Sequence, residues 1–316
     1  MIPTATLGRN PLQVSRLGLG TAPLSGLYRP VSDEEAVTTI QYALEQGITL
    51  FDTAPLYGRG RSEALVGKAL AGIPRDRYQL STKVGRLLNP ETGEMGFDFS
   101  RDGVLRSLEG SLARLQTDRV EILHIHDPDN HLEQALEQAY PTLVELRRQG
   151  VIRAVGAGMN QWQALWHLAR HGEFDCFLLA GRYTLLEQEA LPFLDYCLDE
   201  GIGLLLGGVF NSGILATGPV PGARYNYREA PPAILERVAA IEAVCRRHGV
   251  PLPAAALQFA RSHGAVASLV VGAVSPGEIA QNLEAWHRPI PSALWEELRS
   301  QALIAPGAPI PSSHGA

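Results

Sequence analysis

Four polar residues of this chain could together move a proton to or from an alcohol or a carbonyl group. Asp52 and Tyr57 belong to the segment FDTAPLYG. Lys83 closes the segment YQLSTKV, and His126 closes the segment EILHIH. Each segment begins as a short apolar run with the alternation of a strand and then meets turn residues or polar residues. Because the carboxyl ends of parallel strands meet at one edge of a sheet, these positions predict a single active site.

The residue types indicate the chemistry. A hydride can leave a carbinol carbon only if the hydroxyl proton also leaves, so the reaction needs a base whose pKa lies near neutrality. A tyrosine with its usual pKa of about 10 is a poor base at neutral pH. A nearby lysine ammonium favours the phenolate, and a histidine can orient the substrate oxygen or relay a proton. Taken singly, such a tyrosine is most often a loop residue and a buried Asp–Lys pair is often structural, but their joint placement at strand ends favours catalysis.

The elements that must position these residues alternate regularly along the chain. Eight apolar runs are predicted as strands, over residues 17–20, 49–52, 79–83, 121–126, 152–157, 174–180, 203–206 and 268–271. Eight helical patterns lie between and after them, over residues 33–46, 62–71, 102–115, 132–148, 162–170, 190–200, 234–248 and 276–286. Eight alternations predict an α/β fold, a (β/α)8 TIM barrel with its active site at the carboxyl ends of the strands.

Local signals agree with a barrel. Ser32 followed by Glu35 is the signature of a capping box, and Gly47 ends the first helix before the next strand. A hairpin-like start precedes the first strand, and residues 305–316 resemble a loose tail. Residues 1–316 are therefore predicted to form a single domain with an N-terminal hairpin and a C-terminal extension. Two long loops, 86–100 and 211–232, are expected to frame the substrate mouth.

Composition favours small-molecule chemistry. The 316 residues carry a formal charge of -6 and no basic run, which argues against binding to nucleic acid or to an anionic membrane. The first residues lack the charged start and apolar run of a secretory signal, so a cytoplasmic location is expected. Cys176, Cys197 and Cys245 are odd in number and lie in apolar segments, as expected of reduced core thiols. Nothing in the sequence indicates the oligomeric state.

The motifs FDTAPLYG with the following RSEALVGKAL, STK and IHDP give the chain a resemblance to the aldo-keto reductase superfamily. Within it, the chain resembles the bacterial and plant sugar dehydrogenases that oxidise L-fucose, D-arabinose or L-galactose, with pyridoxal 4-dehydrogenase as a near relative. The resemblance implies that Tyr57 is the general acid/base and that Lys83 lowers its pKa. It also implies that Asp52 is the partner of Lys83 and that His126 orients the substrate. His124 projects to the same side of its strand as His126, and it is expected to be a packed residue one layer deeper.

The resemblance also implies a nicotinamide dinucleotide as cofactor and no metal. The chain has neither a GxGxxG nor a GK[ST] motif, so barrel loops rather than a Rossmann or P-loop motif would hold the dinucleotide. The pyrophosphate and the neighbouring ribose are expected at Phe210, Asn211, Ser212, Gly213 and Leu215. The adenosine end is expected at Gly272, Ser275, Glu278 and Asn282.

Two of these positions bear on the choice between NAD and NADP. Members of the family that use NADP commonly carry Lys and Arg where this chain has Gly272 and Glu278. A carboxylate would repel a 2′-phosphate but could accept a hydrogen bond from a free ribose hydroxyl. NAD is therefore the expected cofactor, and NADP remains possible. A simpler interpretation is that Glu278 only stabilises the first turn of a helix.

The nicotinamide end departs from the family pattern. The usual Ser-Asn pair after the fifth strand is replaced by GMN, so Asn160 is expected to hold the carboxamide one residue later. The aromatic residue that would stack on the nicotinamide falls on Gly207. Phe210 or Tyr183 could replace it.

Asp127, directly after His126, indicates a hydroxylated substrate. Many relatives that act on apolar carbonyls have Trp at this position, whereas a carboxylate can accept hydrogen bonds from a diol. Asp127 could instead cap the loop beside Pro128. The leading prediction is oxidation of a cyclic aldose at C1 to its lactone, with hydride transfer to NAD.

Four alternatives stay open. Pyridoxal could be oxidised to its lactone by the same residues, or the chain could be a general NADPH aldehyde reductase. It could also be a non-catalytic dinucleotide-sensing subunit. The HIHD run is compatible with a metal-dependent hydrolase on the same kind of barrel, but that would leave Tyr57 and Lys83 without a role.

Overall fold

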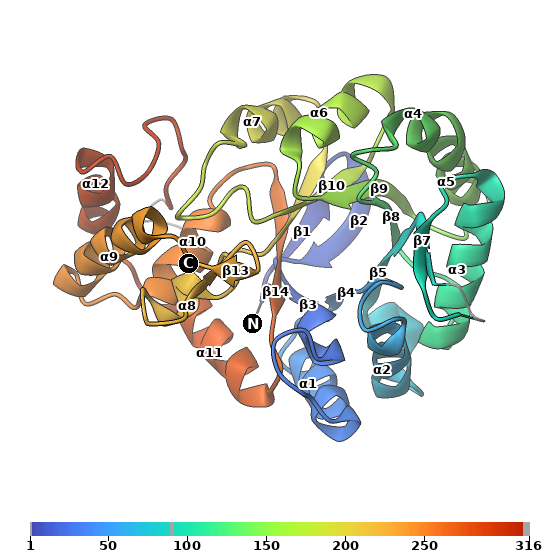
Figure 1. Ribbon diagram of the computed structural model, residues 1–316, viewed down its shortest axis with the longest axis horizontal. Coiled ribbons are helices and arrows are strands. Elements are labelled where there is room, and N and C mark those ends of the chain that lie inside the picture. The colour runs from blue at the N-terminus through green and yellow to red at the C-terminus, as the bar shows by residue number, and fades with distance from the viewer. Residues whose placement is uncertain (1, 89–91, 312–316) are drawn as a thin grey trace.

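The computed structural model describes residues 2–88 and 92–311 and contains a closed barrel of eight parallel strands surrounded by helices (Figure 1). This confirms the predicted (β/α)8 fold. The barrel strands, in order around the barrel, are β3 (Leu17–Gly20), β4 (Leu50–Asp52), β5 (Gln79–Val84), β8 (Ile122–His126), β9 (Ala154–Met159), β10 (Cys176–Ala180), β11 (Gly203–Gly207) and β14 (Val266–Gly272). Sequence order and spatial order therefore coincide.

The register of these strands brings the catalytic candidates to one end. Asp52 pairs with Ser81 across β4 and β5, and Lys83 pairs with His124 across β5 and β8. His126 pairs with Gly158 across β8 and β9. The last residues of neighbouring strands therefore lie at the same carboxyl-terminal mouth, as the fold requires.

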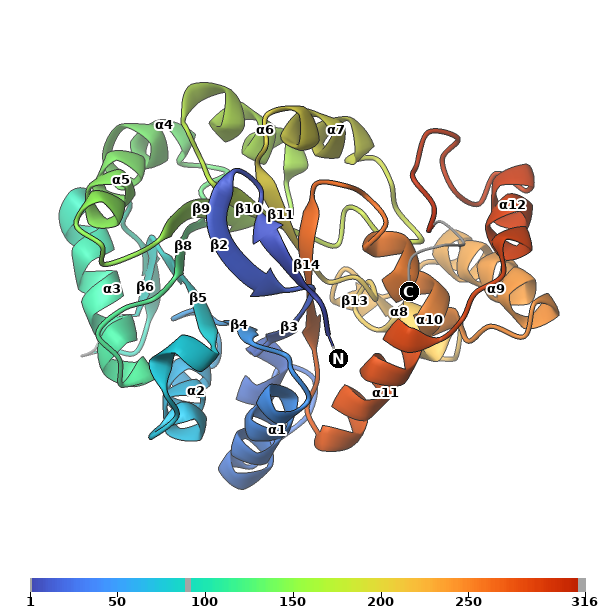
Figure 2. The same cartoon turned by 180° about the vertical axis from the view of Figure 1, so that it is seen from behind.

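An antiparallel hairpin covers the opposite end of the barrel. It consists of β1 (Thr4–Leu7) and β2 (Asn10–Ser15), and Figure 2 shows it lying across the strand ends. The turn packs closely against the start of β11, because a Cβ at Gly8 would collide with the Gly201 carbonyl. The predicted N-terminal hairpin is confirmed.

Helices follow the barrel strands around the outside (Figure 1). The helices up to the sixth strand are α1 (Asp33–Glu45), α2 (Arg61–Leu70), α3 (Arg101–Leu115), α4 (Leu132–Gln134), α5 (Tyr140–Arg148), α6 (Trp162–His171) and α7 (Leu191–Asp199). Ser32 caps α1 by accepting a hydrogen bond from the amide of Glu35, as predicted. The Glu35 carboxylate, however, pairs with Arg29 instead of completing the capping box.

The predicted helix over 132–148 contains a π-helical turn at Ala135–Ala139, between α4 and α5. Pro141 is the second residue after this turn. Because proline has no amide proton, it cannot continue the regular i to i−4 hydrogen bonding, and the wider turn accommodates the change.

One helix next to β14 was missed by the sequence prediction. The pattern at 234–248 forms α9 (Pro232–Arg247), but α10 (Leu252–Ala260) is the helix in contact with β14 and with α11 (Pro276–His287). Helix α9 instead packs on α12 (Ser292–Ser300) outside the barrel ring (Figure 1). In α10 every residue except Pro253 is buried, so the segment lacks the one-sided apolar pattern of a surface helix.

The two long loops also contain structure. The first holds an antiparallel pair, β6 (Arg86–Leu88) and β7 (Met95–Phe97), although residues 89–91 of this loop lie outside the described residues. The second holds the short helix α8 (Ile214–Thr217) and the hairpin of β12 (Arg224–Tyr225) and β13 (Arg228–Glu229). Both loops follow the carboxyl ends of barrel strands, where they were expected.

The prediction of a loose tail is wrong for its described part, residues 305–311. Ala308 is fully buried, and its carbonyl accepts a hydrogen bond from Arg299. The carbonyl of Pro309 accepts a hydrogen bond from Ser262. These contacts hold the segment on the barrel surface, and residues 312–316 lie outside the described residues.

Candidate active site

A buried ion pair forms the base of the site. The Lys83 ammonium donates to Asp52 Oδ2 and to the Thr53 carbonyl, at 2.7 Å in each case. The other oxygen of Asp52 accepts a hydrogen bond from Ser81 at 2.8 Å. Lys83 is 1% exposed and Asp52 is 3% exposed. A buried charge is tolerated only when it is paired and hydrogen-bonded, and here both charges are.

Tyr57 lies directly above this pair, in the turn after β4. Its ring centroid is 4.8 Å from the Lys83 nitrogen and 6.1 Å from the centre of the His126 ring, to which it is almost perpendicular. Gly58 makes the turn possible, because it has a φ of 59° and a Cβ there would lie 2.6 Å from Ser25. Tyr57, Lys83, Asp52 and His126 therefore form one cluster, as the sequence predicted.

The electrostatics of Tyr57 differ from the expectation. Burial raises the pKa of Tyr57, and the Asp52 carboxylate raises it further, whereas the charge and hydrogen bond of Lys83 lower it. The net effect is a pKa above the usual 10. Burial lowers the pKa of Lys83, but Asp52 and Tyr57 outweigh this and raise it to about 12. Lys83 therefore does lower the pKa of the phenol, but not far enough to overcome burial when only the protein surrounds it.

His126 is held neutral. Burial lowers its pKa well below the usual value, and the cations Lys83 and Arg86 lower it further. Its Nδ1 is buried with no hydrogen-bond partner among the described residues, whereas Nε2 lies 3.7 Å from Asp127 Oδ2. A neutral imidazole can present a hydrogen bond to a substrate oxygen without adding a charge.

His124 is fully buried one layer below, as expected. Burial lowers its pKa to about 3, and Lys83 contributes in the same direction. Its ring packs closely against Gly156, where a Cβ would collide with Nδ1. His124 is therefore a neutral packing residue.

A second ion pair lies beside His126 and was missed by sequence reasoning. Arg86 Nη1 donates to Asp127 Oδ2 at 2.6 Å. The sequence indicated Asp127, but Arg86 is 41 residues away and carried no signal beyond its position just after Lys83. Asp127 makes no side-chain hydrogen bond to the loop backbone among the described residues, which argues against the capping role considered above.

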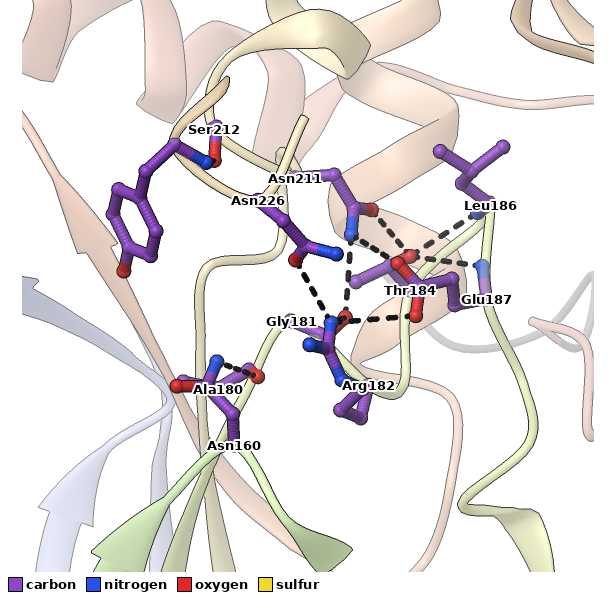
Figure 3. A network of polar contacts seen from close by, with 11 residues as sticks. Asn160, Ala180, Gly181, Arg182, Thr184, Leu186, Glu187, Asn211, Ser212 and Asn226 are labelled. Atoms are coloured by element: carbon purple, nitrogen blue, oxygen red, sulfur yellow. Dashed lines mark hydrogen bonds and ion pairs between the residues drawn. The ribbon is translucent and has the colours of Figure 1, made fainter. Parts of the chain in front are cut away.

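The loop after β11 is joined to the loop after β10 by a polar network (Figure 3). Asn211 accepts from Thr184 Oγ1 at 2.6 Å and donates to the Gly181 carbonyl at 3.2 Å and to Glu187 Oε1 at 3.0 Å. Arg182 donates to Asn226 at 3.0 Å in the β12–β13 turn. The Asn211 side chain is thus fully engaged in holding the loops together.

The backbone of this loop has the geometry of a ligand site. Asn211, Ser212 and Gly213 have successive φ values of 46°, 60° and 99°. For residues other than glycine this left-handed conformation costs about 1–2 kcal/mol each, and such strain is concentrated at functional sites. Ser212 Oγ accepts from the Tyr227 amide at 3.0 Å, which leaves its own proton free to donate. Open space lies around Gly213, since a Cβ there would meet nothing within 4 Å. These features fit a phosphate group.

Four other candidates of this region differ in accessibility. Asn160 follows β9 and donates to the Ala180 carbonyl at 2.7 Å, and Phe210 is partly exposed. Leu215 is fully buried in α8. Tyr183 is 1% exposed and stacks on Phe259 with 5.5 Å between ring centres. Tyr183 therefore presents no ring face at the mouth, and Phe210 remains the aromatic candidate.

The predicted adenosine end lies where β14 meets α11. Ser275 caps α11 by accepting from the Glu278 amide at 3.2 Å. Glu278 Oε2 in turn accepts from the Val274 amide at 2.9 Å, so the simpler capping interpretation holds for one carboxylate oxygen. Gly272 is closely packed, because a Cβ there would lie 2.7 Å from Pro23. Asn282 is partly exposed on the same helix.

No group of three or more His, Cys, Asp or Glu side chains within residues 2–88 and 92–311 is placed to hold a metal ion. The three cysteines are free and buried. No helix in the described part of the chain is long and apolar enough to cross a membrane.

Comparison with known proteins agrees with the fold and identifies the family. Residues 16–302 match the model of the Aldo/keto reductase family. The chain is 40% identical over 314 residues to D-threo-aldose 1-dehydrogenase from Pseudomonas sp, which covers 93% of this chain and 95% of that protein. It is 39% identical over 333 residues to pyridoxal 4-dehydrogenase from Microbacterium luteolum, covering 95% and 97%. It is 32% identical over 285 residues to L-galactose dehydrogenase from Arabidopsis thaliana, covering 88% and 86%.

A solved structure gives the same result. The holo form of aldo-keto reductase AKR11C1 from Bacillus halodurans superposes with a TM-score of 0.81 at 26% identity, over 99% of both chains. The family match covers most of the chain, and the relatives are similar over nearly their whole length. The chain belongs to the aldo/keto reductase family and is an oxidoreductase of that family.

Proposed function

We propose that this protein is an NAD-dependent aldose 1-dehydrogenase that oxidises a cyclic aldose of the L-fucose, D-arabinose or L-galactose type to its lactone. The observation that carries the proposal is the Asp127 carboxylate, held 3.7 Å from His126 Nε2 beside Tyr57. A charged, hydrogen-bonding group at this place suits a hydroxylated substrate better than an apolar one. Two relatives of the chain are sugar dehydrogenases by name.

The four clustered residues have complementary roles in this reaction. His126 Nε2 donates a hydrogen bond to the oxygen on C1, and Tyr57 accepts the proton of that hydroxyl as the C–O bond becomes a carbonyl. A bound oxidised nicotinamide would accept the hydride from C1, and its positive charge would also favour the phenolate. Lys83 stabilises the phenolate electrostatically, and Asp52 holds Lys83 in place.

The dinucleotide would be held by loops at the mouth. In the proposal, Asn160 binds the carboxamide and Phe210 covers the nicotinamide. Ser212 and Gly213 bind the pyrophosphate. Asn211 and Leu215 shape this loop, because the side chain of Asn211 is already bonded and that of Leu215 is buried.

The adenosine end supports NAD over NADP. In the proposal Ser275, Glu278 and Asn282 line this end. Pro23 closes Gly272, so a lysine cannot occupy that position without moving Pro23. Arg29 reaches this region and donates to the Val274 carbonyl at 3.4 Å, but it is neutralised by two hydrogen bonds to Glu35, at 2.6 and 3.1 Å. The charges of Arg29, Glu35 and Glu278 sum to −1, which disfavours a 2′-phosphate.

We expect removal of these carboxylates to improve NADP binding. Glu278→Gln keeps the acceptor that caps α11 but removes a negative charge, and Glu35→Gln frees Arg29. A unit charge about 6 Å from a phosphate dianion changes affinity by about tenfold in a water-like medium. Each change should lower the Kd of NADPH by about tenfold, measured by fluorescence titration, with little effect on NADH. Glu34→Gln, an exposed neighbour on α1, is the control. The role of these charges would be refuted if Glu34→Gln improved NADPH affinity equally, or if neither Glu278→Gln nor Glu35→Gln improved it.

The function itself is tested by absorbance at 340 nm with NAD and NADP in parallel, against L-fucose, D-arabinose, L-galactose and pyridoxal. Reduction of NAD with one of the sugars is the expected result. Pyridoxal oxidation without sugar oxidation would favour the second candidate, pyridoxal 4-dehydrogenase, which the 39% identical relative supports. Activity only with NADPH and simple aldehydes would indicate a general aldehyde reductase. Dinucleotide binding without any turnover would favour a sensing subunit.

We also infer the domain organisation, the location and the kind of partner of this protein. Residues 1–316 act as one barrel domain, the reaction takes place in the cytoplasm, and the partner is a small molecule. Each remains a prediction from the sequence.

A further inference from the structure

The Arg86–Asp127 ion pair lies at the edge of the catalytic cluster. Its Nη1–Oδ2 distance is 2.6 Å, and the same Oδ2 is 3.7 Å from His126 Nε2. The side chains are 24% and 28% exposed, so the pair is neither sealed in the core nor free in solvent. A partly desolvated pair at a mouth can still exchange hydrogen bonds with a ligand.

The backbone holds Asp127 in a strained position. Its φ is 46°, a left-handed conformation that residues other than glycine adopt at a cost, and Asn or Asp adopt most readily. The Asp127 amide donates to the Gly158 carbonyl at 3.0 Å, which extends the pairing of β8 with β9 by one residue. In this conformation the carboxylate accepts from Arg86 and lies 3.7 Å from His126 Nε2, and such outliers at a site point to a role there.

The β6–β7 hairpin and the preceding glycine hold Arg86 in position. It pairs with Phe97 across the β6–β7 hairpin, and its guanidinium lies 5.1 Å from the centre of the Phe97 ring. Gly85, just before it, has a φ of 94° and packs against Phe99, where a Cβ would collide with the ring. Asp127 is the one side-chain acceptor that the described residues supply to this guanidinium. A guanidinium has five N–H donors, so donors remain for a ligand.

The pair also has a free acceptor. Asp127 Oδ1 receives no hydrogen bond from the described residues, whereas Oδ2 is shared by Arg86 and faces His126. A carboxylate oxygen and a guanidinium N–H side by side match a carbon-bound hydroxyl, which both donates and accepts. A hydroxyl on the carbon next to the reacting carbon would lie closest to this pair, because His126 contacts the oxygen of the reacting carbon itself.

We propose that Arg86 and Asp127 together recognise the hydroxyl group on the carbon adjacent to the reacting carbon, with Asp127 accepting its proton in a hydrogen bond and Arg86 donating to its oxygen. Arg86 also holds the carboxylate in place and is thus a specificity residue for α-hydroxylated substrates. This inference rests on the proposed function, because it places the substrate carbon between Tyr57 and His126.

The alternative is that Arg86 only fastens the β6–β7 hairpin to the barrel. That role would make its removal equally harmful for every substrate. Recognition of a hydroxyl would make the loss depend on whether the substrate carries that hydroxyl. A double-mutant cycle in which the protein side chain and the substrate hydroxyl are removed singly and together therefore distinguishes the two explanations.

The experiment measures kcat/KM for an oxidised aldose and for its 2-deoxy counterpart, for example D-arabinose and 2-deoxy-D-erythro-pentose. The variants are Asp127→Asn, Arg86→Met and Arg86→Lys, with Asp129→Asn as a control for charge in the same loop. With the hydroxylated sugar, Asp127→Asn and Arg86→Met should each lose about tenfold to a hundredfold, as expected of a charged hydrogen bond. With the deoxy sugar the loss should be less than about threefold, and Arg86→Lys should recover part of the activity.

An equal loss with both sugars, or a loss in Asp129→Asn of the same size, would overturn the proposal. Melting temperature and the Kd of NADH, measured on each variant, show whether the fold and dinucleotide binding survive. If the wild-type protein oxidises none of the aldoses, the proposed function fails. The same variants are then assayed in the reducing direction with glyceraldehyde and 3-hydroxypropanal, which differ by the same hydroxyl. If the ratio of kcat/KM for these two aldehydes is the same in the variants as in the wild type, recognition of the hydroxyl by Arg86 and Asp127 is refuted.

The pH dependence of kcat/KM also separates the two explanations, because a purely structural role of Arg86 would not change it. Burial raises the pKa of Asp127, and the Arg86 cation opposes this. The other charged or titratable groups that face Asp127 are Lys83, His126, Asp129 and Tyr227. In Arg86→Met the opposing cation is gone, so the pKa rises further and the carboxylate is lost at a higher pH. The ratio of kcat/KM for the hydroxylated sugar to kcat/KM for the deoxy sugar should therefore begin to fall at a higher pH in Arg86→Met than in the wild type. Ionisation of Tyr57 affects both sugars and cancels in this ratio.

Discussion

Tyr57→Phe is expected to lower kcat by about a thousandfold or more while dinucleotide binding stays within about twofold of the wild-type value. The change removes one oxygen from the centre of the cluster and leaves the ring, which lies 4.8 Å from the Lys83 nitrogen. General acid–base catalysis is worth about 10²–10⁴-fold, and here no neighbour can replace the phenol. Asp52 is hydrogen-bonded to Lys83, and burial lowers the pKa of His126, which makes its imidazole a weak base.

The measurement is steady-state turnover together with a fluorescence titration of NADH. Tyr196→Phe on α7, far along the chain from the cluster, makes the same chemical change as a control. If Tyr57→Phe binds NADH poorly, the role of Tyr57 as the proton-transfer group is wrong and the residue instead shapes the dinucleotide site. If turnover survives at more than about a tenth of wild type, the base lies elsewhere.

Lys83→Met is expected to abolish turnover and also to destabilise the fold. It removes the cation and leaves the Asp52 carboxylate, which is 3% exposed, without its partner. Breaking a buried pair in this way costs about 3–5 kcal/mol of the free energy of unfolding. Denaturant titration should show this loss. The double variant Asp52→Asn with Lys83→Met removes both charges, and it should recover most of the stability but none of the activity.

Lys83→Met should also change the pH dependence of the remaining activity. Oxidation needs the phenolate of Tyr57, so the rate rises with pH as that group loses its proton. Lys83 lowers the pKa of Tyr57, whereas burial and Asp52 raise it. Without Lys83 the pKa of Tyr57 moves up, and any residual rate should climb at a higher pH than in the wild type. A profile that stays in place, or moves to lower pH, would show that Lys83 does not act on the phenol.

Local sequence patterns were enough to predict the barrel and the clustering of Asp52, Tyr57, Lys83 and His126. Asp52 and His126 are the last residues of short strands, and Lys83 is the last residue but one of β5. The carboxyl ends of these strands coincide because parallel barrel strands pair in register. The capping serine of α1 was equally readable, because its partner is only three residues away. Features of this kind depend on neighbours in the chain or on the rules of one fold.

Helices without a one-sided pattern could not be predicted in the same way. The helix next to β14 is α10, which is buried among α8, α9 and α11 and has apolar residues on nearly every side. The amphipathic segment α9 was easier to recognise but lies outside the ring. Hydrophobic periodicity identifies helices that have one solvent-exposed face, and it fails where tertiary packing buries every face.

The sequence by itself predicted the family, the barrel and the cluster of four polar residues, because short motifs and their places at or just after the ends of strands suffice for this. Only the tertiary structure showed that Arg86 meets Asp127, that Pro23 closes Gly272, and that burial raises the pKa of Tyr57 despite Lys83. The physical reason is the same in each case. Steric closure, ion pairing and desolvation depend on atoms that are far apart in the chain and become neighbours only when the barrel closes.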